Sequence, residues 1–364
     1  MHLKVFDPHA ASDAEWAALN EFENRMLAET FPDDPPRPLA LTIREQTRTP
    51  AILLRTRWAA WREDGGAILG QGVVDMWQVQ DNQHLAFVQI EVRPEARCQG
   101  IGTALLARAA ATVQASGRST LMGRALANVP SGAAFAERVG AKAGLPSRRN
   151  QFDMRDLDLA RMRAWVARAQ ERAAGFSVGF WGETYTEEAL EAVVHMLSAM
   201  NDAPHDDTVE EEIWTVDELR DLEATYKEQG LVRWTMYARE TSSGAYAGYT
   251  EVYWNALQPT LLQQGDTAVL PAYRNLGLGR WLKAAMILRV LADRPQVRFV
   301  RTGNADANAP MLNINHEMGF RPFHLRTSYT IEAAQALAYT ENAAAHKQEG
   351  APEELRQSHR GHRE

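Results

Sequence analysis

The chain has 364 residues, of which 45% are hydrophobic and 24% charged, so its length favours two domains and its composition is typical of a soluble globular protein. The formal net charge of −8 argues against nucleic acid and anionic membrane surfaces as partners, because both are bound mainly through basic residues. The single cysteine, Cys98, excludes an internal disulfide and a multi-cysteine metal site, and we expect no bound metal. No apolar stretch is long enough to cross a membrane, and the first residues lack a signal-peptide pattern, so we expect a cytoplasmic protein.

The first half of the chain is predicted to begin with a helix and to continue through strands into a glycine loop. An amphipathic helix is expected at 12–28, and an acidic, proline-containing loop at 31–36. Alternating apolar residues predict the strands that follow, at 51–60, 67–79 and 85–92. After Gly102 the apolar residues recur at helical spacing, and a last strand is expected at 151–157.

The second half repeats this order of elements. Its helix is expected at 186–200, its acidic loop at 201–207, and its strands at 232–240, 245–254 and 267–270. Five residues around the glycine loop recur 177 positions later: Val92, Pro94, Arg97, Gly100 and Gly102 correspond to Val269, Pro271, Arg274, Gly277 and Gly279. The repeat predicts an α/β (α+β) fold of two tandem domains, each a mixed, mostly antiparallel sheet flanked by helices.

The repeat also sets the expected domain boundaries. The first domain is predicted to span 1–157 and the second 175–340, with a connecting helix at 158–174. Residues 341–364 have few apolar side chains and are predicted to be a disordered tail.

Each glycine loop has a composition suited to binding phosphate. A strand that ends in R-x-x-G-x-G and runs into a helix turns several backbone N–H groups outward at the positive end of the helix, where a pyrophosphate can bind. The arginine would add a charged donor. A dinucleotide fingerprint would need a third glycine where Leu105 and Leu282 stand, and the G-K-[ST] of a Walker loop is absent.

Both loops resemble the acetyl-CoA signature of the GNAT superfamily of N-acetyltransferases. Residues 302–320 are similar to the Asn-rich stretch of tandem GNAT proteins, the group that includes mycothiol synthase, and the two copies cover residues 3–336. The resemblance implies acetyl-CoA as the acyl donor, and a primary amine of a small molecule that attacks the thioester directly. It also implies main-chain pairing of the pantetheine with residues 91–93 and 268–270.

The resemblance assigns cofactor-binding residues in both halves. In the first half they are Val92, Arg97, Gln99, Gly100, Ile101, Gly102 and Thr103. In the second half they are Val269, Arg274, Asn275, Leu276, Gly277, Leu278, Gly279, Arg280, Asn304, Asn308 and Asn315. Asn308 is also a good helix N-cap before Pro310, and plain structural hydrogen bonding is an alternative for Asn304 and Asn315.

The catalytic residues are less sharply predicted. The tyrosine that usually acts as the family's general acid is replaced by Ala136 and Asn315. All tyrosines lie at or beyond Tyr185, so a tyrosine acid working within one domain would belong to the second half, and we expect turnover there.

Two sets of residues are candidates for the general base. Strand alternation puts Glu251 on one face with Tyr253, as a possible base and acid, although a solvent-facing strand would show the same pattern. Glu91, beside the first loop, is a separate candidate base. A catalytically silent acyl-CoA-binding or sensing protein is the alternative function, because the usual acid tyrosines are missing.

The acceptor is predicted from the acidic stretch 201–212, which contains no Lys or Arg. In the family the corresponding loop forms one wall of the acceptor cleft, so clustered carboxylates would favour a cationic amine. The alternative is that these residues only cap a helix start. We expect a monomer or homodimer.

Overall fold

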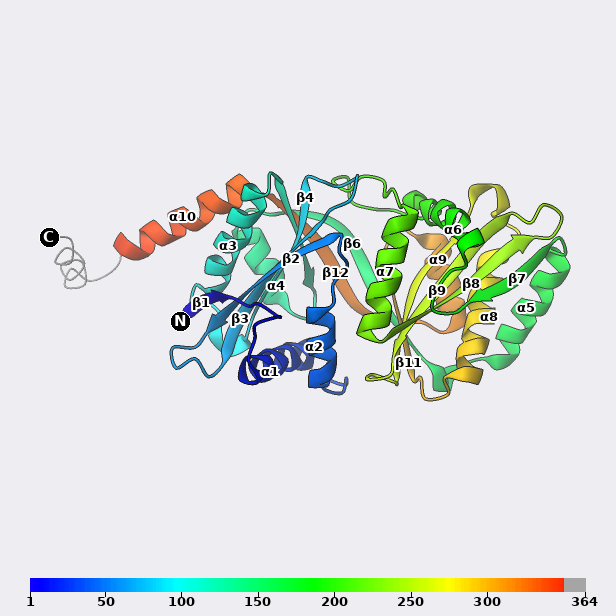
Figure 1. Ribbon diagram of the computed structural model, residues 1–364, viewed down its shortest axis with the longest axis horizontal. Coiled ribbons are helices and arrows are strands. Elements are labelled where there is room, and N and C mark those ends of the chain that lie inside the picture. Colours follow the sequence, from blue (N-terminus) through cyan, green and yellow to red (C-terminus); the bar gives the residue numbers. More distant parts are fainter. Residues whose placement is uncertain (350–364) are drawn as a thin grey trace.

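The computed structural model describes residues 1–349 and contains one continuous sheet of 12 strands. The strands follow the order β1-β2-β3-β4-β5-β12-β6-β11-β10-β9-β8-β7. Strands β1 to β5 lie at one end of this sheet and β7 to β11 at the other, with helices on both faces (Figure 1). The predicted α/β (α+β) architecture with two repeated halves is confirmed.

The first half contains six strands and five α-helices. The strands are β1 (His2–Val5), β2 (Leu53–Trp61), β3 (Ile68–Trp77), β4 (Leu85–Val92), β5 (Thr120–Leu126) and β6 (Lys142–Asp153). The helices are α1 (Asp13–Thr30), α2 (Leu39–Thr47), α3 (Ile101–Ala115), α4 (Pro130–Arg138) and the connecting helix α5 (Leu159–Arg172).

The second half repeats the order. Its strands are β7 (Phe176–Trp181), β8 (Leu231–Glu240), β9 (Tyr246–Asn255), β10 (Leu261–Val269), β11 (Phe299–Ala305) and β12 (Arg321–Glu332). Its α-helices are α6 (Leu190–Leu197), α7 (Val216–Gln229), α8 (Leu278–Asp293), α9 (Ala309–Met318) and α10 (Ala333–Glu349). Within residues 1–349, no helix is both long enough and apolar enough to cross a membrane.

Local sequence signals explain where several helices begin and how they pack. Ser12 and Glu15 form a capping box at the start of α1, and Thr215 and Glu218 form the same motif at the start of α7. The apolar stripe expected after Gly102 is buried along α3, where it packs on the first-half sheet.

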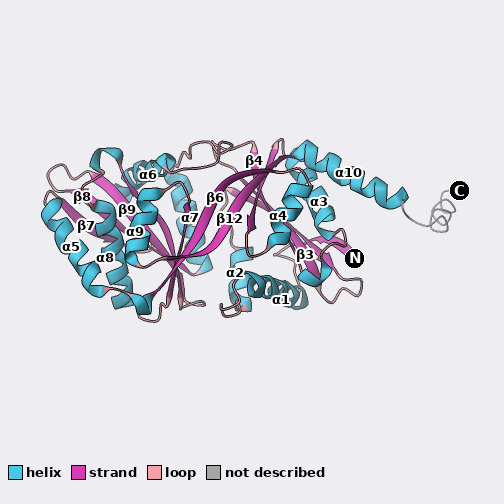
Figure 2. Cartoon of the chain, turned by 180° about the vertical axis from the view of Figure 1, so that it is seen from behind, coloured by secondary structure: helices cyan, strands magenta, loops and turns pink. Residues whose placement is uncertain are grey.

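The two halves exchange their last strands. Strand β12 pairs with β5 of the first half, and β6 pairs with β11 of the second half. The strands β6 and β12 pair with each other, so both cross the middle of the molecule (Figure 2). The halves defined by sequence are therefore interleaved within the sheet, and the last strand of each one completes the other.

The predicted disordered tail at 341–364 begins within a helix, α10. Residues 341–349 belong to α10, so the prediction is wrong for them, and residues 350–364 lie outside the described part of the chain. The helix forms because its first turns are anchored: Ala336 is fully buried, and Leu337 and Tyr339 pack on the first-half core.

Each half of the sheet opens where its two parallel strands diverge. Strand β4 pairs with β5 only from Leu85 to Phe87, and β10 pairs with β11 only from Leu261 to Gln263. Beyond these residues each pair is splayed, and β4 and β10 lead directly to the two glycine loops.

Candidate active site

The two glycine loops have the same backbone conformation. Gly100 and Gly277 are left-handed, with φ of 87° and 85°, and each is the N-cap of the following helix. The residue two positions earlier is also left-handed in both loops, Cys98 with φ of 61° and Asn275 with φ of 67°. Glycine suits the N-cap because a side chain at positive φ is strained there.

This conformation leaves a series of backbone donors free. From Cys98 to Thr103, six successive N–H groups donate no hydrogen bond to any residue within 1–349. The same holds for the six residues from Asn275 to Arg280 in the described chain. Each set lies at a helix N-terminus, so both loops can bind a phosphate-like anion.

The loop arginines pair with carboxylates in this structure. Arg97 donates through Nε to the carbonyl of Val92 at 3.1 Å and forms a bidentate pair with Glu29 at 2.7 and 2.5 Å. Arg274 donates to the carbonyl of Val269 at 3.0 Å and pairs with Asp202. Both guanidinium groups brace their loops against helical segments of the same half, and the charged-donor role remains a prediction.

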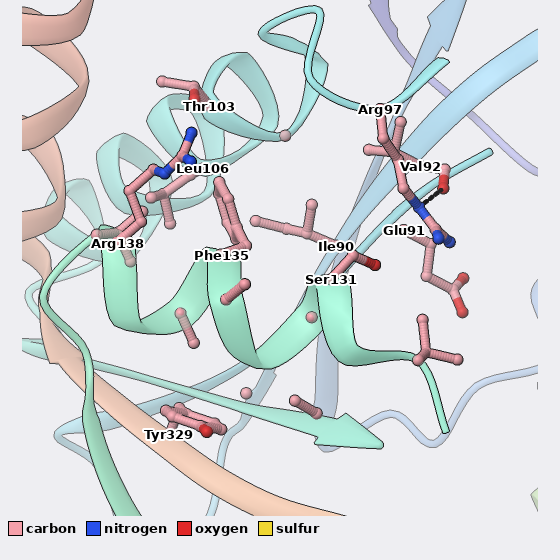
Figure 3. A pocket seen from close by; sticks show the side chains of 18 of the residues that line it. Ile90, Glu91, Val92, Arg97, Thr103, Leu106, Ser131, Phe135, Arg138 and Tyr329 are labelled. Carbon is pink, nitrogen blue, oxygen red and sulfur yellow. Dashed lines mark hydrogen bonds between the residues drawn. The ribbon is translucent and has the colours of Figure 1, made fainter. Parts of the chain in front are cut away.

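A cavity of about 530 Å³ lies beside the first glycine loop, in the opening between β4 and β5 (Figure 3). Its wall includes every loop residue from Arg97 to Thr103 except Gln99, together with Ile90, Glu91 and Val92 of β4 and Arg124 of β5. Helix α4 covers it with Phe135, whose ring lies 3.4 Å from the position of a Cβ added to Gly102. The cavity therefore joins the free N–H groups to a carboxylate.

That carboxylate, Glu91, is hydrogen-bonded to a neighbouring strand. Its Oε2 accepts a hydrogen bond from Gln71 Nε2 at 2.7 Å, and Gln71 in turn accepts from the buried Arg57. Desolvation raises the pKa of Glu91 above its ordinary range, and Glu23 raises it further, while Gln71 opposes the shift. A glutamate with a raised pKa, facing a cavity, is a suitable general base.

Tyrosines from the second half of the chain reach this cavity. Tyr329 of the exchanged strand β12 and Tyr339 of α10 both line it. The inference that a tyrosine acid must work in the second half assumed that each half contains only its own strands. Strand exchange removes that assumption.

In the predicted pair of the second half, Glu251 is buried and Tyr253 is half-buried, so the strand face is not open to solvent. Glu251 is 4% exposed, and its carboxylate accepts hydrogen bonds from Tyr185 Oη at 2.5 Å, Tyr253 Oη at 2.8 Å and Thr235 Oγ1 at 3.2 Å. Desolvation and the charge of Glu251 raise the pKa of Tyr185 and of Tyr253. This carboxylate is fully hydrogen-bonded to protein groups.

Asp266 is a second-half residue that the sequence analysis missed. It lies where β10 shifts register against β9, between Gln264 and Thr267. Solvent still reaches its side chain, but desolvation by the surrounding protein and the charges of Glu251 and Glu212 raise its pKa to about 7. The repeat places Gln89 at the equivalent position, so internal similarity gave no signal.

The three asparagines assigned to cofactor have structural partners. Asn308 Oδ1 accepts from the Met311 N–H at 3.3 Å and caps α9, as the alternative interpretation predicted. Asn315 Nδ2 donates to Asn304 Oδ1 at 2.8 Å, and Asn315 is 1% exposed. The hydrogen bond between Asn315 and Asn304 joins α9 to β11.

Two other predicted cofactor residues point away from their loops. Arg280 forms a bidentate pair with Glu317 at 3.2 and 2.8 Å, which ties α8 to α9. Gln99 donates to the carbonyl of Glu95 at 3.2 Å. The backbone N–H groups of both residues are free for a ligand.

The acidic stretch of the second half bonds to the first half. Asp206 accepts from the N–H of Leu145, and Glu210 accepts from the N–H of Asn82 at 2.7 Å. These carboxylates hold the segment against β6 and the loop before β4. The expected acidic wall of a cationic acceptor cleft is thus at least partly an interface between the halves.

Comparisons with known proteins agree with this fold. Residues 16–141 match the family model described as the acetyltransferase (GNAT) family. A tandem GNAT protein from the clavulanic acid biosynthesis pathway superposes with a TM-score of 0.74 and 24% identity, over 91% of this chain and 98% of its own. No curated protein sequence matches significantly.

Two further solved structures share the fold. A GCN5-related N-acetyltransferase from Sphaerobacter thermophilus has a TM-score of 0.62 and 14% identity, over 91% of this chain and 95% of its own. The glucosamine N-acetyltransferase region of a fungal multi-domain β-N-acetylglucosaminidase has a TM-score of 0.63 and 12% identity, over 90% of this chain and 38% of that protein.

Residues 16–141 thus resemble an acyltransferase domain, and the chain as a whole folds into two repeated halves. More particularly, residues 16–141 are similar to the GNAT acetyltransferase family, and the whole chain has the tandem GNAT fold. The resemblance predicted from the two glycine loops is confirmed to this extent.

Proposed function

We propose that the protein is an N-acetyltransferase that uses acetyl-CoA to acetylate a primary amine, and that turnover takes place in the first half. The observation that carries this proposal is the cavity of about 530 Å³ that connects the free N–H groups of the first loop to Glu91. The family match to residues 16–141 supports it, because it falls on the same half. The prediction of turnover in the second half loses its main support, since Tyr329 lines the first-half cavity.

The first loop fits the pyrophosphate of coenzyme A. Six free N–H groups at the start of α3 match an anion with several acceptor oxygens, and the absence of a Cβ at Gly102 keeps the approach open beneath Phe135. The opening between β4 and β5 leaves room for the pantetheine arm along residues 91–93. Acetyl-CoA would supply the activated acetyl group.

Glu91 removes the proton that makes the acceptor unreactive. A primary amine is protonated near neutral pH, and only the free base attacks a thioester carbonyl. Glu91 accepts a proton from the ammonium, either directly or through water. Because its pKa is raised, Glu91 is a stronger base than an exposed glutamate, and its pKa lies closer to that of the amine.

The second glycine loop supports a second coenzyme A site. Its free donors and its two glycines repeat the first loop, and Asp266, with a pKa near 7, lies on the strand that leads to it. We therefore expect two coenzyme A molecules per chain. Whether the second loop also supports turnover is decided by the same variants that test the first.

The test compares matched blocks of the two loops. Gly102→Val places a branched side chain against Phe135 and among the free donors, while Gly279→Val is its counterpart in the second half. We expect Gly102→Val to abolish release of free CoA with amine acceptors and to lower the calorimetric stoichiometry from two to one. Gly279→Val should also bind one equivalent but keep most of the activity.

The opposite pattern would move turnover to the second half. Stoichiometric acetyl-CoA binding with no turnover across a broad amine panel would favour the alternative, a catalytically silent acyl-CoA sensor. Absence of acyl-CoA binding by the wild-type protein would refute the proposed function.

A further inference from the structure

Four arginines form a row across the centre of the sheet, on neighbouring strands of both halves. They are Arg124 on β5, Arg326 on β12, Arg149 on β6 and Arg301 on β11. Register and contacts put them on one face. Arg124 lies opposite Ser328, which is two residues from Arg326 and so on the same face as Arg326. Arg149 lies opposite Gly303, and Nη2 of Arg326 lies 3.5 Å from the position that a Cβ of Gly303 would take.

Only one arginine of this row is neutralised by a carboxylate. Arg301, 3% exposed, forms a bidentate pair with Asp34 of the loop between α1 and α2. Within residues 1–349, no carboxylate lies within ion-pair distance of Arg124, Arg149 or Arg326. The row therefore has an excess of positive charge.

The arginines also act on each other. Desolvation, then the charges of Arg124 and Arg149, lower the pKa of Arg326 to about 10. Desolvation and the charge of Arg301 lower the pKa of Arg149, although Asp34 opposes the shift. Repulsion among partly desolvated cations is relieved when an anion binds between them.

One end of the row reaches the proposed active site. Arg124 lines the same cavity as Glu91. The side chains of Glu91 and Arg124 lie on the same face of the sheet. Phe87 of β4 pairs with Met122 of β5 in parallel register, and Glu91 and Arg124 each follow their member of that pair by an even number of residues. A molecule whose amine lies at Glu91 can therefore place a second group at Arg124, and Arg326 lies on the next strand of the sheet.

We propose that the acceptor amine also carries an anionic group, a carboxylate or phosphate, which Arg124, Arg326 and Arg149 bind. This inference rests on the proposed function, and it names the class of acceptor. It reverses the prediction of a cationic acceptor. That prediction relied on an acidic segment in which Asp206 and Glu210 are bonded to the first half.

A matched amine panel tests the substrate class. We would measure kcat/KM with acetyl-CoA for β-alanine, its uncharged amide, ethanolamine phosphate and putrescine. At least one of the two anionic amines should exceed the amide by about 10-fold or more, which is the scale of a charge-assisted hydrogen bond. Whether the carboxylate or the phosphate is preferred identifies the source of the charge. Equal or better turnover of the amide or of putrescine would overturn the inference.

Variants of the row separate binding from structural support. Arg124→Gln and Arg326→Gln should each raise KM for the preferred anionic amine by about 10- to 100-fold, and they should lower kcat/KM much more for that amine than for the neutral amide. Arg148→Gln is the matched control: it lies on β6 beside Arg149, but its side chain pairs with Asp306 at 2.7 Å. Equal losses for charged and neutral amines would indicate a structural role and contradict the inference.

Failure of the inference can be distinguished from failure of the proposed function. Turnover confined to neutral or cationic amines would leave the function standing and refute the anionic acceptor. If no amine were acetylated, the function would fail, and calorimetric titration of β-alanine and ethanolamine phosphate into the CoA-loaded protein would still decide the inference. Binding that Arg326→Gln weakens supports it, and no binding of either anion refutes it.

Discussion

Glu91 and Tyr329 line the same cavity although they belong to opposite halves of the sequence. Glu91 is on β4, where the splayed strands open, and Tyr329 is on β12, which pairs with β5 of the first half. The proposed active site of the first half is therefore built from both halves of the chain.

Replacement of Glu91 tests the general base. Glu91→Gln keeps the size and the contact with Gln71 but cannot accept a proton, so we expect kcat to fall by about 10²- to 10⁴-fold. The wild-type rate should rise with pH through the raised pKa of Glu91, because the carboxylate is the active form. The variant should lose this ascending limb of the pH profile.

Glu95→Gln is the control for this variant, because Glu95 is exposed on the turn after β4. It should keep wild-type kcat and the wild-type pH profile. A fully active Glu91→Gln enzyme would assign the proton transfer to another group.

Tyr329 is a candidate for the acid that protonates the departing thiolate. Tyr329→Phe removes one hydroxyl from a side chain that is 9% exposed, so it preserves the packing of β12. We expect kcat to fall by about 10²-fold, with the dissociation constant of acetyl-CoA unchanged. Tyr339→Phe, a change at the other cavity tyrosine, should be close to wild type. Equal kcat for Tyr329→Phe and wild type would mean that solvent supplies the proton.

The Asp34–Arg301 pair should stabilise the contact between the halves. Asp34→Asn would leave a buried guanidinium without a counter-charge, so we expect the free energy of unfolding to fall by about 3–5 kcal/mol in urea titrations. Asp33→Asn changes an exposed neighbour and should cost less than about 0.5 kcal/mol. A similar small effect for both variants would show that the pair contributes little to stability.

Lys283 should make the stability of the protein depend on pH. It is 1% exposed on α8, and desolvation lowers its pKa from 10.5 to about 7. Between these values the unfolded chain binds a proton that the folded chain does not. Stability should therefore rise with pH by up to about 1.4 kcal/mol per unit, and the dependence should vanish below pH 7.

Lys283→Met removes this proton linkage. In urea titrations, the free energy of unfolding of the variant should exceed that of wild type at pH 7, and the two free energies should converge toward pH 10. The control Lys227→Met, at an exposed lysine, should leave the free energy of unfolding unchanged at both pH values. A parallel pH dependence in wild type and Lys283→Met would contradict the assignment.

Local features of the molecule could be predicted from sequence. The glycine loops were recognised because their conformation depends on a few adjacent residues, and Gly100 and Gly277 indeed adopt nearly the same positive φ. The apolar stripe of α3 and the strands β2 and β3 follow from periodicity within one segment. Asp266 was missed because a register shift in β10, rather than any repeated residue, exposes it.

Relationships between distant segments could not be predicted in the same way. The sequence of β12 suits a central strand, but nothing in its alternation says which half of the sheet it joins. Arg124, Arg326 and Arg149 form a row only because β12 pairs with both β5 and β6, so the sequence alone could not predict it. Glu251 was mistaken for a possible solvent-facing residue because its partner Tyr185 comes from a segment far away in sequence.

The strand exchange has the geometry of a domain-swapped dimer whose two subunits have become one chain. Two separate copies of such a half would have to meet before either could complete its sheet, so their folding would depend on concentration. Within a single chain, the connecting helix α5 keeps the partner at a fixed, high effective concentration. Covalent fusion thus makes permanent an assembly that separate halves would lose on dilution.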